Sequence, residues 1–418
     1  MGKELFKNML LEEIKRIDAL AISKRHEKVI EGFSNTNECP RAIIEGKDFL
    51  IFNSNDYLGL RFNNNILAAA ERGAVTFGKS PGAVRFISGT TQAHKDLEKS
   101  LSIFHGKQDA MVFSSAFSAN VSVLHALLKG QSAGSLVSAD TLVISDELNH
   151  RSIIEGVRVA NFTNEQKKIF KHMDYTDLEN ILIQNKGKFL RVVIATDGIF
   201  SMLGEAQDIK KIKTLAEKYD EDFEQGIIVI VDDAHGVGCF GPTGRGCEEV
   251  FGAESDILVG TLGKAFGAEG GYVTADKIFI DYLRESAASY IYSNSISGAG
   301  ASAGIEAIRL MSGNYGTAVL KKLQDNITFF KQKAHESGLI FANNSNHPIQ
   351  PILIGDPLKT KKIAEELFKK GFLVTALSHP IVPAGKDEIR VQLSASHNES
   401  DIEQFVSACA QHYIDSSP

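Results

Sequence analysis

The sequence predicts an α/β fold with a mostly parallel central sheet in a large domain and a smaller α+β domain at the C-terminus. Two observations predict this fold. Short runs rich in Val and Ile recur along the chain and end in polar or small residues, and segments with helical spacing of apolar residues separate them. Such runs between helices are typical of buried parallel strands with helices on both faces of the sheet.

The expected strands of the large domain end at residues that carry a hydrogen-bonding group or are small. They are AMVFSS (110–115), TLVISD (141–146), RVVIATD (191–197), GIIVIVDD (226–233), DILVGT (256–261) and GGYVTA (270–275). In open α/β sheets, ligands bind beyond the carboxyl ends of the strands. The strand ends therefore predict the place of a site.

The ends of the chain differ from this pattern. Apolar spacing over 1–30 predicts an N-terminal helix, and the C-terminal part combines two helical segments with two strand-like ones, namely 359–372, 372–377, 388–395 and 399–414. We expect an N-terminal helical segment over 1–50, a large α/β domain over 51–295 and a small α+β domain over 296–418.

The composition excludes several function classes. The chain has 418 residues, a formal net charge of -7 and no long block of basic residues, so nothing draws it to nucleic acid or to an anionic membrane. Its four cysteines show no C-x-x-C spacing, and neither a signal peptide nor an apolar membrane span is apparent. We expect a reduced, cytoplasmic protein without a nucleic-acid partner or an integral membrane segment.

One lysine stands among glycines where a strand is expected to end. Lys264 lies in GTLGKAFGAEGG, directly after DILV. A P-loop would need a glycine at position 258 and a serine or threonine at 265, where this chain has Leu258 and Ala265. Lys264 is therefore either a covalent nucleophile or a surface charge.

A second glycine pattern predicts nothing further. HGVGCFG has the G-x-G-x-x-G spacing of a dinucleotide site, but VDDAH separates it from the strand. The residues after it are too rich in Gly and Pro to open a helix. We expect no NAD site.

Three residues after expected strands fit the chemistry of a pyridine cofactor. A buried Asp232 could hold a pyridine nitrogen protonated, which makes the ring an electron sink, and His235 could hydrogen-bond the phenolic oxygen. Lys264 could form a Schiff base. Each residue alone is more often a turn, cap or surface residue.

Other residues fit the phosphate and the ring face of the same cofactor. The amides of Ala116 and Phe117 open a helix after a strand and could bind a phosphate, with the Thr261 hydroxyl as a further donor. The ring of His150 could stack on the cofactor. Together these residues predict a pyridoxal 5'-phosphate site.

The motifs that carry these residues resemble those of the α-oxoamine synthase family. The similarity runs from about NSNDYLGL at Asn53 to SASHNE at Glu399. The specific motifs are VRFISGTTQAHKDLE, ISDELNHRSIIEG, TDGIFSMLG, VDDAHGVGCFGPTGRG, GTLGKAFG, YSNS and EIRVQLSASH. The resemblance implies the pyridoxal phosphate-dependent transferase fold of type I.

The resemblance also implies roles at the cofactor ring. Lys264 carries the cofactor and later moves the α-proton of the substrate. Asp232 pairs with the pyridine nitrogen and His235 with the ring oxygen. His150 stacks on the ring, and Ser201 hydrogen-bonds near it.

Further roles concern the phosphate and the substrate. The resemblance implies that Ala116, Phe117 and Thr261 hold the phosphate, and that Ser293 reaches it from the other subunit of a homodimer with a shared active site. Arg390 would clamp the amino-acid carboxylate, for which a planar bidentate donor is suited. Asn55 would lie near the substrate. Ser293 and Asn55 could also be plain turn residues.

The activity implied is the condensation of an amino acid with an acyl-CoA, which releases coenzyme A. Within the family the motifs favour the branch that joins glycine to acetyl-CoA. Alanine or serine stay open as the amino acid, because the sequence does not measure the space at the α-carbon. A longer acyl chain stays open, because two stretches before His150 and Asp232 are longer than the family pattern. A fold-type I aminotransferase and a catalytically silent scaffold are the other hypotheses.

Overall fold

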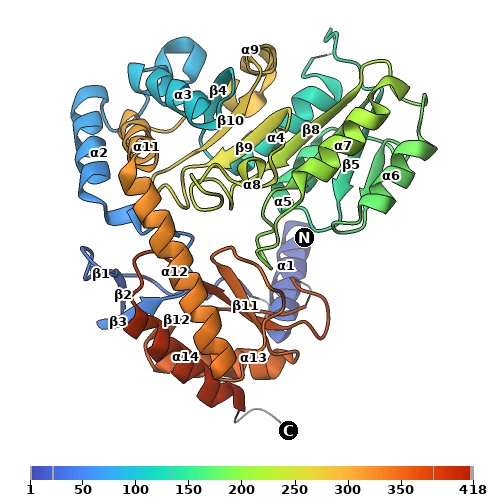
Figure 1. Cartoon of the computed structure of the whole chain (residues 1–418). Coiled ribbons are helices and arrows are strands. Elements are labelled where there is room, and N and C mark those ends of the chain that lie inside the picture. Colours follow the sequence, from blue (N-terminus) through green and yellow to red (C-terminus); the bar gives the residue numbers. More distant parts are fainter. Residues whose placement is uncertain (1, 21–22, 133, 380, 415–418) are drawn as a thin grey trace.

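A computed structural model describes residues 2–20, 23–132, 134–379 and 381–414. Its centre is a seven-stranded sheet with the order β4-β10-β9-β8-β7-β5-β6 (Figure 1). The strands are β4 (Asp109–Phe113), β5 (Thr141–Asp146), β6 (Lys167–Phe170), β7 (Arg191–Asp197), β8 (Ile227–Asp232), β9 (Ile257–Thr261) and β10 (Gly271–Ala275). The expected α/β fold with a mostly parallel sheet is confirmed.

Alternation along the strands explains why helices cover both faces of this sheet. On β7, Val192 and Ile194 belong to one apolar cluster, whereas Val193 and Ala195 belong to a second one on the opposite face. The first cluster includes residues of α3 (Gln92–His105), α6 (Tyr175–Gln184), α7 (Ile209–Tyr219) and α11 (Gly298–Met311). The second includes residues of α4 (Ala116–Lys129), α5 (Arg151–Val159) and α9 (Lys277–Ser286).

A smaller unit below this sheet in Figure 1 is built from both ends of the chain. One sheet has the order β1-β2-β3-β12 and another the order β11-β14-β13. Their strands are β1 (Gly32–Ser34), β2 (Arg41–Ile44), β3 (Lys47–Ile51), β11 (Ile349–Leu353), β12 (Phe372–Leu373), β13 (Thr375–Leu377) and β14 (Glu388–Gln392). The helices of this unit are α12 (Asn314–Glu336), α13 (Pro357–Lys369) and α14 (Glu399–Ile414).

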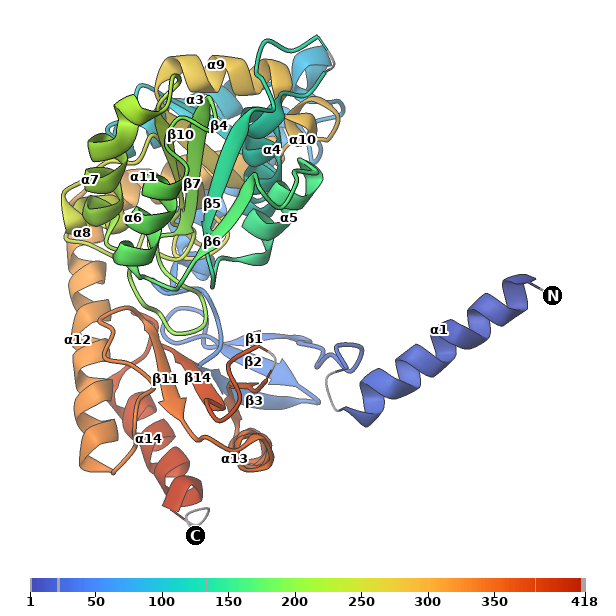
Figure 2. The same ribbon diagram turned by 90° about the vertical axis from the view of Figure 1, so that its right-hand side faces the viewer.

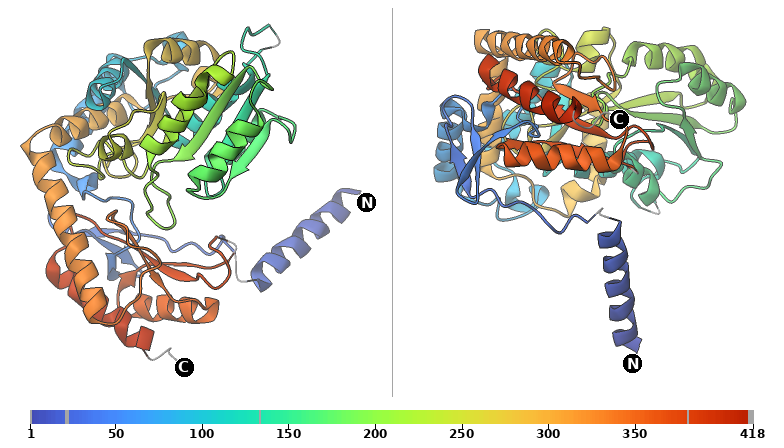
Figure 3. Two further views of the ribbon diagram at one scale, coloured as in Figure 1. Left: turned by 45° about the vertical axis from the view of Figure 1, so that its right-hand side comes forward. Right: turned by 90° about the horizontal axis from the view of Figure 1, so that it is seen from below.

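The remaining elements are short or lie near the N-terminus. They are α1 (Gly2–Ala19), α2 (Asn64–Phe77), α8 (Cys247–Phe251), α10 (Ala288–Ile291), two 3-10 turns (Leu60–Phe62 and Asp220–Asp222) and a π-helical turn (Arg85–Gly89). Helix α1 stands away from the rest of the chain in Figures 2 and 3 and buries none of its residues.

The structure differs from the sequence-based expectation in three places. Residues 32–51 form strands instead of continuing an N-terminal helical segment, because β3 pairs in parallel with β12, far along the chain. Helix α11 belongs by its packing to the large sheet, although the expected small domain begins at 296. Strand β10 is antiparallel to both of its neighbours.

Candidate active site

Lys264 lies in the turn that joins β9 to β10. The turn is closed by hydrogen bonds from the Leu262 amide to the Gly270 carbonyl (2.9 Å) and from the Gly267 amide to the Lys264 carbonyl (3.0 Å). Gly267 has a φ of 63°, and a side chain there would meet the backbone of Arg61 at 2.6 Å. The glycine therefore lets the lysine turn lie directly against residues 60–61.

Burial lowers the pKa of Lys264 to about 8, although the carboxylates of Asp232 and Asp197 act in the opposite direction. A lysine amine is a nucleophile only when it is neutral. The surroundings of Lys264 therefore suit a covalent role, as the sequence predicts.

Asp232 ends β8 and is buried. One of its carboxylate oxygens accepts a hydrogen bond from the Asn120 side-chain amide at 2.5 Å, and the other accepts one from the Ala234 amide at 3.0 Å. Asn120 lies on α4 and also donates to the Ser152 hydroxyl at 2.9 Å. The sequence analysis missed Asn120, because an asparagine inside a helix carries no pattern that distinguishes it.

A second buried carboxyl lies beside Asp232 in the sheet. Asp197 ends β7 in register with Asp232, and burial together with the Asp232 charge raises its pKa well above the usual range. One Asp197 oxygen accepts a hydrogen bond from the His150 amide at 3.1 Å. The sequence analysis placed Asp197 at a strand end but gave it no role.

The two predicted histidines lie at the same edge of the sheet. His150 precedes α5, and its Nδ1 is 2.7 Å from the Ser152 hydroxyl. The ring of Phe117 meets it edge-on, with centroids 6.4 Å apart. Desolvation lowers the pKa of His150, with Asp232 raising it and Lys264 lowering it.

His235 is more enclosed. Its Nδ1 is 2.8 Å from the Tyr57 hydroxyl, and burial lowers its pKa well below the usual value, with the Lys264 and Arg390 charges acting in the same direction. His235 is therefore a neutral ring. Tyr57 is a further residue that the sequence analysis did not single out.

Arg390 joins the site from β14 of the smaller unit. Its Nη1 donates to the Gln392 side chain at 2.9 Å, and Gln392 donates to the Asn55 side-chain oxygen at 2.6 Å. The Tyr57 hydroxyl donates to the same Asn55 oxygen at 3.2 Å. These contacts link the predicted substrate residues Arg390 and Asn55 to His235.

The guanidinium of Arg390 is not fully satisfied. Its Nε is buried and has no hydrogen-bond partner among the described residues, and burial lowers its pKa. A buried cationic donor of this kind is costly unless an anion binds it. The arrangement fits a bound carboxylate.

The start of α4 lies against the β9 and β10 strand ends. A side chain on Gly271 would meet the Ala116 amide nitrogen at 2.1 Å, and Gly271 pairs with Thr261 in the sheet. Thr261 therefore lies close to the helix start at Ala116 and Phe117, where free amides favour an anion. In this structure the Thr261 hydroxyl donates to the Gly270 carbonyl at 3.0 Å.

Comparisons with known proteins agree with this geometry. The family model described as aminotransferase class I and II matches residues 47–408. A Petrotoga mobilis 8-amino-7-oxononanoate synthase is 36% identical and covers 95% of both chains. The mitochondrial 2-amino-3-ketobutyrate coenzyme A ligase of Bos taurus is also 36% identical, over 96% of this chain and 91% of its own. The chain belongs to the α-oxoamine synthase family.

A solved structure supports the same assignment. A high-resolution structure of SPT with a PLP internal aldimine superimposes with a TM-score of 0.84 at 25% identity, over 98% of this chain and 97% of the other. The α-oxoamine synthases are pyridoxal phosphate-dependent acyltransferases, and the expected resemblance is confirmed. Since relatives with two different names are equally identical, overall identity does not separate their activities.

The residues of this α-oxoamine synthase fit pyridoxal phosphate. The fold brings an amine, a carboxylate and two imidazoles to one place, namely those of Lys264, Asp232, His150 and His235. Their closeness is seen in the effects that their charges have on one another's pKa values. The free amides at the start of α4 complete the donor set for a phosphate.

Two predicted residues lie apart from these contacts. Ser201 is in the turn after β7 and lines a cavity together with Leu148, two residues before His150. Ser293 is exposed after α10. Its predicted role in the site of a partner subunit stays a prediction.

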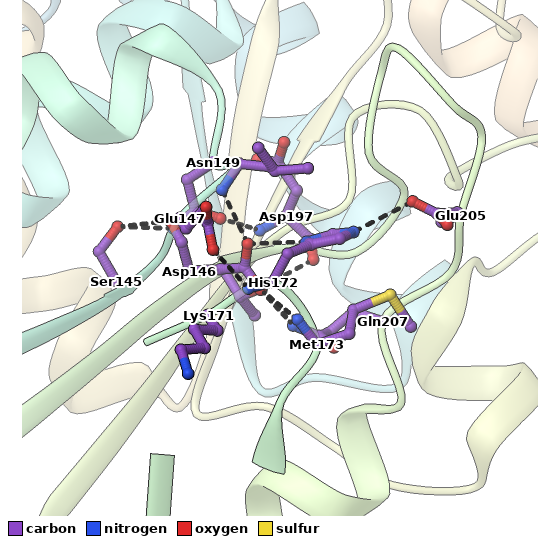
Figure 4. A network of polar contacts seen from close by, with 12 residues as sticks. Ser145, Asp146, Glu147, Asn149, Lys171, His172, Met173, Asp197, Glu205 and Gln207 are labelled. Atoms are coloured by element: carbon purple, nitrogen blue, oxygen red, sulfur yellow. Dashed lines mark hydrogen bonds and ion pairs between the residues drawn. The ribbon is translucent and has the colours of Figure 1, made fainter. Parts of the chain in front are cut away.

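A polar network connects the loop that follows β5 with the turn that follows β7 (Figure 4). His172 lies between two carboxylates, with Nδ1 2.9 Å from Asp146 and Nε2 3.0 Å from Glu205. Burial opposes its protonation, but the two carboxylates outweigh this and raise its pKa to about 9. His172 is therefore an imidazolium that ties the loop after β5 to the turn after β7. The sequence analysis missed it.

Asn149 extends this support to His150. Its side-chain amide donates to the Ala195 carbonyl at 2.7 Å, and its side-chain oxygen accepts from the Asp197 amide at 2.9 Å. The loop between Asp146 and His150 is thus held at both ends.

Proposed function

We propose that this α-oxoamine synthase condenses a small amino acid, preferably glycine, with an acyl-CoA, preferably acetyl-CoA, to give an α-amino ketone and free coenzyme A. The observation that carries the proposal is the single group of charges around Lys264. Burial and the Arg390 charge lower the pKa of Lys264, and the carboxylates of Asp232 and Asp197 oppose this shift. An amine for the cofactor and a cation for a carboxylate thus meet at one site.

Pyridoxal phosphate, when bound, supplies an electron sink for the charge that develops at the α-carbon of the amino acid. Asp232 would keep the pyridine nitrogen protonated, and Asn120 fixes the orientation of that carboxylate. His150 would stack on the ring and His235 would face its oxygen. The amides of Ala116 and Phe117, with Thr261, would hold the phosphate.

The remaining residues act on the substrates. Arg390 binds the amino-acid carboxylate. Gln392 accepts a hydrogen bond from Arg390 and donates one to Asn55, and it thereby holds Asn55 near the substrate. The neutral Lys264 amine removes the α-proton, and the α-carbon then forms a bond to the thioester carbonyl carbon. The carbon–sulfur bond breaks, and the thiolate takes up the proton that Lys264 removed and leaves as coenzyme A. The condensation product is an α-amino β-keto acid, which gives the simple α-amino ketone when its carboxylate leaves as carbon dioxide.

We further propose a homodimer with its active site at the subunit interface. Two features of the single chain support it. Helix α1 leaves the apolar side chains of Leu5, Phe6 and Met9 exposed. Tyr292, which precedes the predicted interface residue Ser293, is exposed as well. Exposed apolar groups of this kind are typical of interaction surfaces.

The alternative activity is the condensation of alanine or serine with a longer acyl-CoA, as in other members of the family. The activity of a fold-type I aminotransferase is less favoured. None of the described helices is long and apolar enough to cross a membrane. We propose a cytoplasmic location on the basis of the sequence.

A thiol-release assay tests the proposal. Glycine, alanine and serine are each combined with acetyl-, succinyl-, pimeloyl- and palmitoyl-CoA, and free coenzyme A is measured. Glycine with acetyl-CoA should give the highest kcat/KM. Keto-acid-dependent turnover without thiol release would instead indicate an aminotransferase.

A further inference from the structure

A cavity of about 260 Å³ lies between the large sheet and the smaller unit. One wall is the turn over residues 200–203, which contributes Phe200, Met202 and Leu203. The facing wall is the loop over 381–383. A cavity of this size has far more room than an acetyl group needs.

The cavity shares elements with the candidate active site. Leu148, in its wall, is two residues before His150, and Glu388 is two residues before Arg390 on β14. Alternate residues of a strand face the same side, so Glu388 and Arg390 point in the same direction. The cavity therefore lies next to the residues that we place around the reacting carbon.

The turn that forms the first wall is held from two sides. Glu205 accepts from the His172 imidazolium (Figure 4), and the ring of Phe200 meets His172 edge-on with centroids 4.3 Å apart. On the other side, the Ser345 hydroxyl donates to the Gly204 carbonyl at 2.5 Å. The cavity is thus preformed between both units.

One polar group in the cavity has no assigned task. Glu388 is fully buried, and neither of its carboxyl oxygens has a hydrogen-bond partner among the described residues. Burial raises its pKa to about 8, with Arg390 lowering it and Glu205 raising it. Lys386, also in the lining, is exposed at the surface. A carboxylate brought into these apolar walls would meet Arg390, which the amino acid occupies, and the His172 imidazolium behind Phe200, whose charge Asp146 and Glu205 already balance.

We propose that this cavity receives the acyl chain of the acyl-CoA, and that Glu388 restricts it to uncharged chains. Acetyl and medium-length unbranched acyl groups enter, whereas acyl groups that end in a carboxylate are rejected. This inference rests on the proposed function and separates the two activities named among the relatives.

Two matched pairs of donors test the restriction. Heptanoyl- and pimeloyl-CoA have the same chain length and differ in a terminal methyl or carboxylate, as do butyryl- and succinyl-CoA. With glycine, we expect kcat/KM to favour the uncharged member of each pair by about 100-fold or more. Equal turnover of heptanoyl- and pimeloyl-CoA would overturn the inference.

Two variants assign the effect to this cavity. Glu388→Gln keeps the shape and removes the ionisable carboxyl, so the heptanoyl-to-pimeloyl ratio measured at pH 9, where a carboxyl with a pKa of about 8 is ionised, should fall by about tenfold. The exposed Glu224→Gln is the control and should leave the ratio unchanged. Met202→Trp narrows the cavity and should lower heptanoyl-CoA turnover relative to acetyl-CoA. An unchanged ratio in either cavity variant contradicts the assignment.

The outcomes separate this inference from the proposed function. If none of the acyl-CoA donors releases free coenzyme A, both the proposed function and the acyl-chain inference are wrong. If acetyl-CoA is turned over but pimeloyl-CoA matches heptanoyl-CoA, only the acyl-chain inference falls.

Discussion

At the scale of single residues, the site depends on how burial changes ordinary side chains. Lys264 is a normal amine whose pKa is lowered to about 8 because it lies in a desolvated turn, and the nearby Asp232 and Asp197 limit the shift. The buried Nε of Arg390 has no hydrogen-bond partner among the described residues, which suits the proposed binding of a carboxylate. Both side chains therefore suit the ligands proposed for them, which are the cofactor aldehyde for Lys264 and the amino-acid carboxylate for Arg390.

The lowered pKa of Lys264 predicts how the apoprotein captures its cofactor. Only the neutral amine reacts with an aldehyde, so the capture rate should rise about tenfold per pH unit below pH 8 and level off above it. Stopped-flow absorbance after addition of pyridoxal phosphate measures this rate. A rate that keeps rising to pH 10, as for an exposed lysine, would contradict the pKa shift.

Arg390→Lys should raise the KM for the amino acid by at least about tenfold and change kcat much less, because lysine retains the charge but loses the planar pair of donors. Initial rates at saturating acyl-CoA measure both constants. The exposed Arg309→Lys on α11 is the matched control. An unaltered KM in the Arg390 variant would remove this residue from the carboxylate site.

At the scale of elements, strand ends and the turns after them position the site. The sequence located most of these ends because each follows a continuous apolar run, and it proposed Lys264, Asp232, His150 and His235 as candidates whose roles stay predictions. It could not find Asn120 or His172, since their partners lie on other elements and only folding brings them together. Strands β1 to β3 were missed for the same reason, because β3 pairs with β12 near the other end of the chain.

The His172 network gives a prediction at this scale. Because the carboxylates of Asp146 and Glu205 raise the folded-state pKa to about 9, the imidazolium contributes stability that is complete below the unfolded pKa of about 6.5. This contribution, on the order of 2–3 kcal/mol, is lost as the pH rises through 9. His172→Asn should therefore melt well below the wild type at pH 6, and the two should converge near pH 9.5.

Thermal unfolding followed by circular dichroism measures this difference across the pH range. The exposed His335→Asn on α12 serves as the control and should melt like the wild type at every pH. A His172 variant with a constant offset from pH 6 to 9.5 would show that packing, not charge, supports the loops.

At the scale of the whole molecule, the site joins a large sheet to a unit built from both ends of the chain. The segment over 53–57 and strand β14 supply Asn55 and Arg390, while β8 and β9 lead to Asp232 and Lys264. The domain bounds predicted from the sequence, 51–295 and 296–418, treat the smaller unit as one continuous segment. Chain order did not reveal that β3 pairs with β12 in the C-terminal part.

The proposed dimer predicts complementation between inactive variants. Ser293→Glu should weaken phosphate binding in the partner's site through repulsion, and Lys264→Ala should inactivate its own site. If Ser293 acts across the interface, mixed dimers contain one site with neither change, and a refolded equal mixture should recover about one quarter of wild-type activity. No recovery in such a mixture, with dimers present by light scattering, would place Ser293 in the site of its own chain.

The most direct measurement of the central claim is reduction of the purified protein with borohydride, followed by digestion and mass spectrometry. If Lys264 holds pyridoxal phosphate, the reagent fixes the cofactor to the peptide that contains Lys264, the protein loses its visible absorbance, and Lys264→Ala gives neither signal. A colourless wild-type protein with an unmodified Lys264 peptide after incubation with the cofactor would contradict the account.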